Sequence, residues 1–151
     1  MTSEIKLPDE PTLNLTAEEA AGRAALLTVY AYDVTVDLTQ PSKDHFPVTT
    51  IVRFAAQAGA TTFIDAITDG ISAITLNGRD LSPQQVSDGT RILLENLQED
   101  NELKVEADFR FMNTGEGMHR FVDPEDGETY LYTQLEVPDA RRVFACFDQP
   151  D

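Results

Sequence analysis

Few side chains in this sequence could do chemistry, and most of those lie near its C-terminal end. Histidine occurs only as His45 and His119, and Cys146 is the single cysteine. Neither histidine has a second ligand at a spacing that suits zinc, so we expect no metal site. Cys146 stands between Ala145 and Phe147, a setting typical of a buried thiol rather than an activated one. We therefore predict no catalytic residue and no metal ligand in this chain.

Two polar residues, Gln134 and Glu136, form the remaining candidate site. The period-2 pattern from Tyr130 to Glu136 predicts a strand in which both side chains share one face, about 6.6 Å apart. An amide beside a carboxylate suits a ligand that carries an ammonium group next to a carbonyl. Spacing alone favours a plainer interpretation, in which both residues are solvated on an edge strand.

A short turn is expected directly after this strand. Pro138 ends the strand, and Asp139 can cap the turn that begins at Ala140. We expect Arg141 and Arg142 to pair with nearby carboxylates, which are abundant in the chain, rather than to bind a substrate.

The elements that must position this segment are mostly strands. Period-2 alternation or short apolar runs predict strands at 30–38, 48–57, 61–67, 90–94 and 102–111, and residues 71–81 predict a hairpin. In the first of these, the apolar residues expected on one face are Tyr30, Tyr32, Val34, Val36 and Leu38. Asn77-Gly78 predicts a hairpin turn, and Ser82-Pro83 predicts a loop. The pair Gly115-x-Gly117 is also interpreted as a loop, not a phosphate cradle, because no helix pattern follows it.

One short helix is predicted, at about residues 16 to 25. Thr16 and Glu19 have the spacing of a capping box, and the following residues favour helix. Residues 1 to 12 are polar and interrupted by proline, which predicts a loose lead-in. With no βαβ rhythm and no repeat, the fold class expected is all-β. We predict an antiparallel, saddle-like β-sandwich or set of curved sheets with one short N-terminal helix.

Composition limits the classes of partner and compartment. The formal net charge of -16 disfavours nucleic acid and anionic membrane surfaces. The sequence has neither a recognisable secretory signal nor an apolar run of about 20 residues, so no membrane span is expected. A single cysteine excludes an internal disulfide and fits a cytoplasmic location. A length of 151 residues predicts one domain, residues 1–151.

Residues 115–150 closely resemble the aminopeptidase N family, which are zinc metallo-aminopeptidases. The family pattern contains Thr-Gln-x-Glu followed by Ala-Arg-x-x-Phe-Pro-Cys-Phe-Asp-Glu-Pro, and this chain has Thr133-Gln-Leu-Glu and Ala140-Arg-Arg-Val-Phe-Ala-Cys-Phe-Asp-Gln-Pro. Ala145 and Gln149 depart from that pattern at positions without chemistry. The strand beginning at Tyr32, the Thr75-Leu-Asn-Gly hairpin and the Asn14-Leu-Thr lead-in also resemble the family's N-terminal domain.

The resemblance implies an N-terminal β domain that packs on a thermolysin-like catalytic domain. It also implies that Glu136 holds the α-amino group of a peptide substrate and that Gln134 helps to position its first residue. Family structures imply a cis peptide between Glu136 and Val137. The zinc ligands, the Gly-x-Met-Glu-Asn motif and the catalytic residues would belong to the parent enzyme beyond Asp151, so we expect no cofactor in this chain. Without that catalytic domain, the segment after Val137 is expected to lose its packing partner.

The resemblance leaves two alternatives to an aminopeptidase. One is the non-catalytic scaffold of a relative that has lost zinc. The other is the N-terminal domain of the family's epoxide-hydrolase branch.

Overall fold

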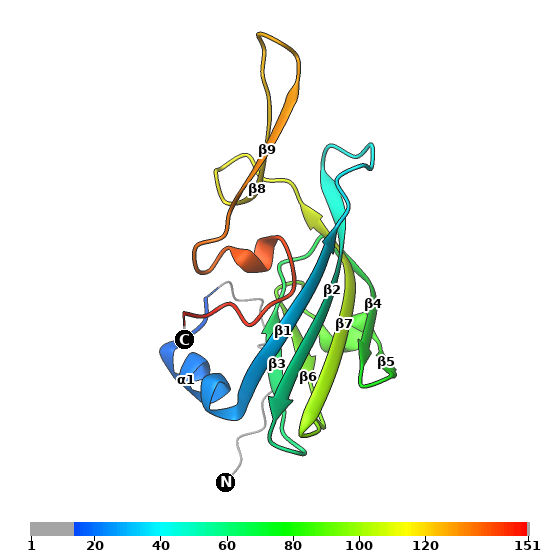
Figure 1. The fold of residues 1–151 in the computed structure, drawn as a ribbon, viewed down its shortest axis with the longest axis vertical. Coiled ribbons are helices and arrows are strands. Elements are labelled where there is room, and N and C mark those ends of the chain that lie inside the picture. The colour runs from blue at the N-terminus through cyan, green and yellow to red at the C-terminus, as the bar shows by residue number, and fades with distance from the viewer. Residues whose placement is uncertain (1–13, 151) are drawn as a thin grey trace.

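A five-stranded antiparallel sheet forms the body of the protein, with strand order β1-β2-β7-β4-β5 (Figure 1). The computed structural model describes residues 14–150, so the predicted lead-in lies outside the described residues. The strands of this sheet are β1 (Leu27–Val36), β2 (His45–Ala56), β4 (Gly70–Leu76), β5 (Arg79–Leu81) and β7 (Asp100–Arg110). The all-β, antiparallel fold class is confirmed.

Strand β7 lies at the centre of the sheet, between β2 and β4. Its alternation is the clearest in the sequence, and Leu103, Val105 and Ala107 are all buried on one face. The intervening charged residues stay on the open face, where Arg53 of β2 pairs with Glu102 at 3.1 Å. One dry face and one wet face are typical of an antiparallel sheet.

The predicted alternation in β1 is wrong at Tyr30. The β1–β2 register shifts between Val29 and Ala31, so Tyr30 is an extra residue in a β-bulge. Its side chain is 62% exposed, whereas Val34 and Val36 pack against the core as expected. A single inserted residue moves every side chain before it to the opposite face.

The Asn77-Gly78 hairpin is confirmed between β4 and β5. Both turn residues have positive φ, 52° for Asn77 and 80° for Gly78, which a type I′ turn requires. Ser82 and Pro83 lead into a single helical turn, α2 (Pro83–Val86), rather than a plain loop. Proline suits the first position of a helix, where no backbone donor is needed.

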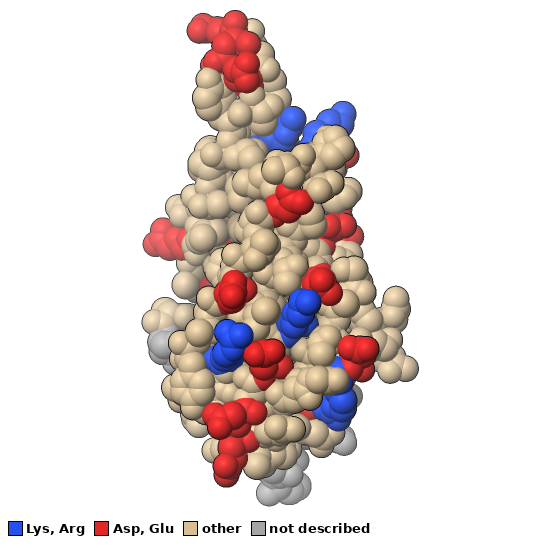
Figure 2. All heavy atoms as spheres, turned by 45° about the vertical axis from the view of Figure 1, so that its right-hand side comes forward, with Lys and Arg blue, Asp and Glu red and all other residues tan. Residues whose placement is uncertain are grey.

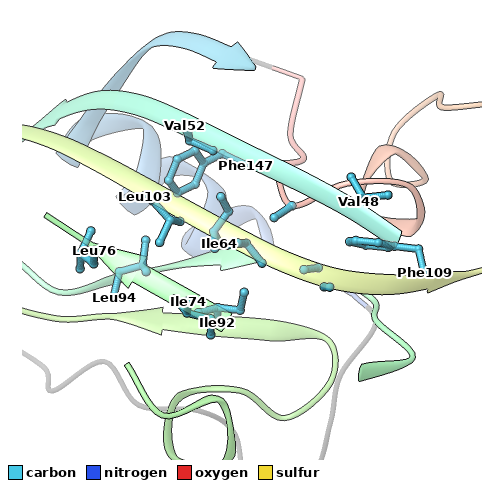
Figure 3. Packing of buried hydrophobic residues seen from close by; sticks show 14 of the residues in the cluster. Val48, Val52, Ile64, Ile74, Leu76, Ile92, Leu94, Leu103, Phe109 and Phe147 are labelled. Atoms are coloured by element: carbon cyan, nitrogen blue, oxygen red, sulfur yellow. The ribbon is translucent and has the colours of Figure 1, made fainter. Parts of the chain in front are cut away.

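A second layer covers the apolar face of the sheet. It consists of β3 (Thr62–Asp65) paired with β6 (Arg91–Leu94), extended by an antiparallel bridge between Asp65 and Cys146. Figure 3 shows side chains of β2 and β7 packed against those from this layer. The largest fully buried side chains are Phe46, Phe54, Phe109, Ile64, Ile74, Leu76, Ile92, Leu94, Leu97, Leu103, Val52 and Val105.

Helix α1 (Ala17–Leu26) runs directly into β1, and Arg23 is its buried residue. The predicted capping box is present: Glu19 N donates to Thr16 Oγ1, and Thr16 N donates to Glu19 Oε2. The short N-terminal helix is therefore confirmed.

A two-stranded arm projects from the body (Figure 1). It pairs β8 (Gly117–Val122) with β9 (Thr129–Gln134). Strand β8 was not predicted, because Gly117 suggested a loop and the residues after it do not alternate in polarity. Its pairing to β9 supplies the backbone hydrogen bonds that the pattern could not indicate.

Candidate functional site

Gln134 and Glu136 lie where the arm joins the body. Gln134 is the last residue of β9, and Glu136 lies two residues later in a turn. Both side chains are exposed, and Glu136 N donates a 3.4 Å hydrogen bond to Gln134 Oε1. The predicted arrangement, two side chains on one face of a continuous strand, is wrong because the strand ends at Gln134.

The turn after β9 spans Glu136 to Asp139. Asp139 N donates to Glu136 O at 3.0 Å, and the Val137–Pro138 peptide is cis, which is the pattern of a type VI turn. The expected cis bond between Glu136 and Val137 is wrong. Cis peptides occur almost exclusively before proline, and here the cis bond is the one that precedes Pro138.

The 3-10 helix η1 (Ala140–Arg142) follows this turn and holds it through its two arginine side chains. Arg141 Nε donates to Pro138 O at 2.9 Å. Arg142 Nε lies 3.0 Å from Asp139 Oδ1 and 3.8 Å from Glu116 Oε2. The predicted pairing with carboxylates is confirmed for Arg142. Asp139 makes no side-chain cap to η1, because its carboxylate accepts from the Arg142 side chain instead.

Gly117, which the sequence indicated only as part of a loop, also belongs to the site. It pairs with Gln134 across the β8–β9 ladder and has a φ of +60°. A Cβ at this position would lie only 2.9 Å from the Arg142 Cβ. The absence of a side chain therefore allows η1 to pack directly against the start of β8, opposite Gln134. A glycine that opens a strand is the only signal that could have indicated it.

The chain beyond the turn is packed into the domain itself. Val143, Ala145 and Phe147 are buried, so the expectation that this segment lacks a packing partner is wrong. The reason is that residues 143–147 fill the core between the two layers, with the Phe147 ring 5.4 Å from that of Phe54. Phe147 N also donates to the hydroxyl oxygen of Tyr32 at 3.0 Å.

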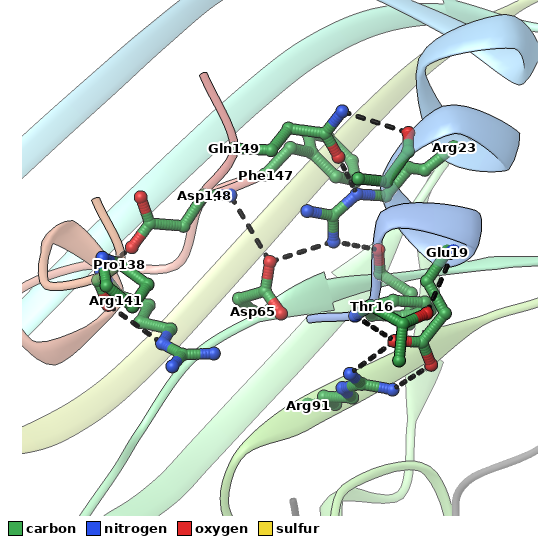
Figure 4. Close-up of polar contacts among 12 residues, drawn as sticks. Thr16, Glu19, Arg23, Asp65, Arg91, Pro138, Arg141, Phe147, Asp148 and Gln149 are labelled. Carbon is green, nitrogen blue, oxygen red and sulfur yellow. Dashed lines mark hydrogen bonds and ion pairs between the residues drawn. The ribbon is translucent and has the colours of Figure 1, made fainter. Parts of the chain in front are cut away.

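A buried ion pair fixes the same segment to α1 and β3 (Figure 4). Arg23 Nη1 lies 2.8 Å from Asp65 Oδ2, and both side chains are almost fully buried. Asp65 Oδ2 also accepts from Asp148 N, and Arg23 Nε donates to Gln149 Oε1. The guanidinium of Arg23 stacks 5.4 Å from the Phe147 ring. These contacts hold the segment after η1 against α1 and β3.

The histidines and the cysteine do not gather at this site. His45 lies 3.8 Å from Asp108, and His119 accepts a hydrogen bond from Gly115 N through Nδ1 and stacks on Tyr132. Burial raises the pKa of the Cys146 thiol, which opposes formation of a thiolate. Within residues 14–150, no three His, Cys, Asp or Glu side chains are close enough together to hold a metal ion.

The chemistry that Gln134 and Glu136 can perform is therefore the recognition of a ligand. An exposed carboxylate accepts charge-assisted hydrogen bonds from an ammonium group, and the neighbouring amide can both donate and accept. Gln134 and Glu136 both lie on a segment that the arm, η1 and the buried ion pair hold in place.

The sequence is 50% identical over 144 residues to aminopeptidase N of Streptomyces lividans, covering 93% of this chain. The resemblance to the aminopeptidase N family is confirmed. This chain spans only 17% of the length of that aminopeptidase N. No protein-family model matches the sequence.

Two solved structures share the fold. Legionella pneumophila aminopeptidase A, in complex with aspartic acid, superposes with a TM-score of 0.66 at 14% identity, covering 83% of this chain and 15% of that one. Native yeast LTA4 hydrolase gives a TM-score of 0.66 at 18% identity, covering 84% and 21% of the two chains.

No helix within residues 14–150 is long and apolar enough to cross a membrane.

Proposed function

We propose that this chain is the substrate-contacting N-terminal β domain of a cytoplasmic zinc metallo-aminopeptidase, which removes single residues from the amino termini of peptides. The observation that carries the proposal is the 50% identity to a protein named aminopeptidase N, over 93% of this chain. The chain corresponds to 17% of that protein, so the domain would act together with a catalytic domain in the rest of the parent.

In this proposal Glu136 binds the free α-ammonium group of the peptide. Its carboxylate is exposed and carries negative charge, so it accepts hydrogen bonds that a neutral or blocked amino terminus cannot supply equally well. Gln134 lies beside it and is joined to it by the 3.4 Å hydrogen bond to Glu136 N. Its amide would help to orient the first residue of the substrate.

The position of Glu136 supports a role in selecting amino termini. The turn that carries it is held by Arg141, through Pro138 O, and by the Arg142–Asp139 ion pair. A carboxylate held on a fixed turn reaches a ligand with less loss of conformational freedom than one on a mobile loop. A peptide that lacks a free amino group would leave this charge without a partner.

The described residues do not fit zinc, because none of their His, Cys, Asp and Glu side chains form a group of three. In this proposal the metal and the residues that activate water lie in the rest of the parent enzyme. Zinc would supply a nucleophilic hydroxide there. This chain would contribute binding and orientation of the substrate.

Kinetics of the parent enzyme test the role of Glu136. Glu136→Gln removes the charge but keeps the size of the side chain, and it should lower kcat/KM for an aminoacyl-nitroanilide about tenfold to a hundredfold. Glu95→Gln, which neutralises an exposed glutamate directly after β6 and outside the arm, is the matched control and should leave kcat/KM unchanged. Equal kinetics of the Glu136→Gln variant and the wild type would refute the assignment.

The two alternative functions, a zinc-less scaffold and an epoxide hydrolase, differ from the aminopeptidase in the part of the parent protein outside this chain. A zinc-less scaffold or a member of the epoxide-hydrolase branch could use the same β domain, and the likeness to the solved structures at 14% and 18% identity concerns the fold alone. The relative named aminopeptidase N favours the peptidase. Reading the gene beyond Asp151 for Gly-x-Met-Glu-Asn and His-Glu-x-x-His distinguishes the three. The pure 151-residue chain should release no product from an aminoacyl-nitroanilide.

A further inference from the structure

Basic side chains lie close together where the β8–β9 arm leaves the body of the protein (Figure 2). A surface hollow of about 660 Å³ is formed at this end by segments that are far apart in the sequence. The loop before β2, the end of β7 and strand β8 each contribute one cation to it: Lys43, Arg110 and Arg120. Three of the 11 Lys and Arg residues thus line one hollow, although Asp and Glu number 27 in the chain. Such a concentration of positive charge is a candidate site for an anion.

Two of the three cations in the hollow lack an acceptor. Neither Lys43 nor Arg120 forms an ion pair or a side-chain hydrogen bond with any residue from 14 to 150. The two carboxylates that line the hollow act on Arg110 instead. Asp69 Oδ1 lies 2.6 Å from Arg110 Nη2, and this hydrogen bond holds the pKa of Arg110 above its usual value, with a smaller contribution from the charge of Asp44. An anion with several oxygens would supply the acceptors that Lys43 and Arg120 lack.

Apolar side chains form part of the wall of the hollow. Phe111 and Met112 line it beside Asn113, whose amide can donate and accept hydrogen bonds. The Phe111 ring centroid lies 4.8 Å from that of Phe46, which is 1% exposed, so the core fixes this wall. Phe111 N also donates to Asp44 O at 3.0 Å, which holds the loop before β2 against the end of β7. Sites for small organic molecules combine apolar walls with a few polar groups of this kind.

The hollow is separate from the candidate substrate site. Gly117 lies opposite Gln134 in the β8–β9 ladder, whereas Arg120 lies opposite Leu131. Successive side chains of a strand point to opposite faces, so Arg120 and Gln134 lie on different faces of the arm. A ligand in the hollow would therefore leave the face that carries Gln134 free.

We infer that this hollow binds a small molecule that carries a phosphate monoester. At neutral pH that group has about two negative charges, which matches the two unpaired cations, whereas a carboxylate has only one. Its oxygens accept charge-assisted hydrogen bonds from the Arg120 guanidinium and the Lys43 ammonium group. The organic part of the molecule lies against Phe111 and Met112. This second site goes beyond the proposed peptidase function and does not depend on it.

Calorimetric titration of the parent protein with phenyl phosphate tests the site. The wild type should bind one molecule with a Kd below about 1 mM at physiological salt. Benzoate has the same ring but a single negative charge, and it should bind at least about tenfold more weakly. The double variant Lys43→Gln/Arg120→Gln should weaken the binding of phenyl phosphate at least about tenfold. Arg120→Lys keeps the charge but not the planar fork, so it should retain part of the affinity.

Arg79→Gln is the matched control for the two charge removals. Arg79 is exposed, forms no ion pair with any residue from 14 to 150 and lies outside the hollow, so this variant should leave the Kd unchanged. Lys43 and Arg120 are not buried either, so their variants should fold like the wild type.

Three results would overturn the inference. The parent protein could show no saturable binding of phenyl phosphate up to about 10 mM. Phenyl phosphate and benzoate could bind with equal Kd, which would show that the second charge is not recognised. The Kd could also remain unchanged in the double variant, which would place the bound phosphate elsewhere in the parent, for example on its metal.

Discussion

Gly117 lies opposite Gln134 in the β8–β9 ladder and in direct contact with Arg142 of η1. The first residue of β8 thus links the candidate substrate residue to the 3-10 helix that holds the Glu136 turn. Because a Cβ at position 117 would approach the Arg142 Cβ to 2.9 Å, this contact depends on glycine. The geometry of the site is therefore sensitive to a residue that carries no functional group.

Gly117→Ala should disturb the site more than the same change elsewhere on the arm. Gly127→Ala is the matched control, since its φ of +74° imposes the same backbone strain but no atom lies within 4 Å of the added Cβ. Both variants should lose about 1 kcal/mol from the left-handed backbone. Only Gly117→Ala should also raise KM of the parent enzyme, because η1 must shift. Equal KM values in the two variants would show that the contact with Arg142 is unimportant.

Removal of Arg23 should destabilise the domain severely. Arg23→Met leaves the Asp65 carboxylate, which is 0% exposed, without its cation at a cost of about 3–5 kcal/mol. The double variant Arg23→Met/Asp65→Asn should recover part of this loss, because no buried charge is then unpaired. Urea unfolding of the four proteins in this cycle measures the coupling. A loss below about 1 kcal/mol in Arg23→Met would contradict the role of the ion pair.

Tyr32→Phe should weaken the anchorage of the C-terminal segment. The substitution removes the acceptor of the Phe147 N–H and should cost about 1–2 kcal/mol in thermal or urea unfolding. Tyr30→Phe, on the exposed bulge, is the control and should have no measurable effect.

The Tyr32 hydroxyl also predicts that the stability of the protein depends on pH in the alkaline range. Burial raises the pKa of Tyr32 from 10.0 to about 12 in the folded protein. The unfolded chain therefore ionises first, and the contribution of Tyr32 is fully present below pH 10 and is lost as the pH rises towards 12. Wild-type stability should fall more steeply over this range than that of Tyr32→Phe. Parallel curves for the two proteins would contradict the assignment.

Glu19 should contribute to stability in the opposite pH range. Hydrogen bonds from Arg91 lower the pKa of Glu19 below its usual 4.5, against the smaller effect of burial. Its contribution is present above pH 4.5 and is lost as the pH falls through the lowered pKa.

Glu19→Gln tests this contribution, because glutamine preserves the capping box but not the charge. Since Glu19 is 33% exposed and screened by solvent, the loss at neutral pH should be about 1 kcal/mol. Acid titration of unfolding should show a shallower loss in the variant than in the wild type. Asp148 titrates with a raised pKa in both proteins, so the difference between the two curves isolates Glu19. An identical acid dependence would exclude the predicted linkage.

Regular alternation made the body of the fold predictable. Strand β7 and the Asn77-Gly78 hairpin follow from local patterns, because one buried face and a turn with positive φ leave their mark on the sequence. The bulge at Tyr30 could not be predicted, because an inserted residue is defined only by the partner strand. Strand β8 was missed for a related reason: its first two residues are buried and its last two are exposed, so burial changes along the strand and imposes no alternation.

The sequence by itself determined the all-β class, the N-terminal helix and the identity of Gln134 and Glu136 as a candidate pair. Only the tertiary structure decided how that pair is held. The strand ends between the two residues, because η1 and the turn at Pro138 redirect the chain where Arg142 meets Gly117. The segment after Val137 is anchored by Arg23 and Asp65, which are 42 residues apart in the sequence. Contacts between distant residues depend on the folded arrangement of whole elements, which local spacing cannot specify.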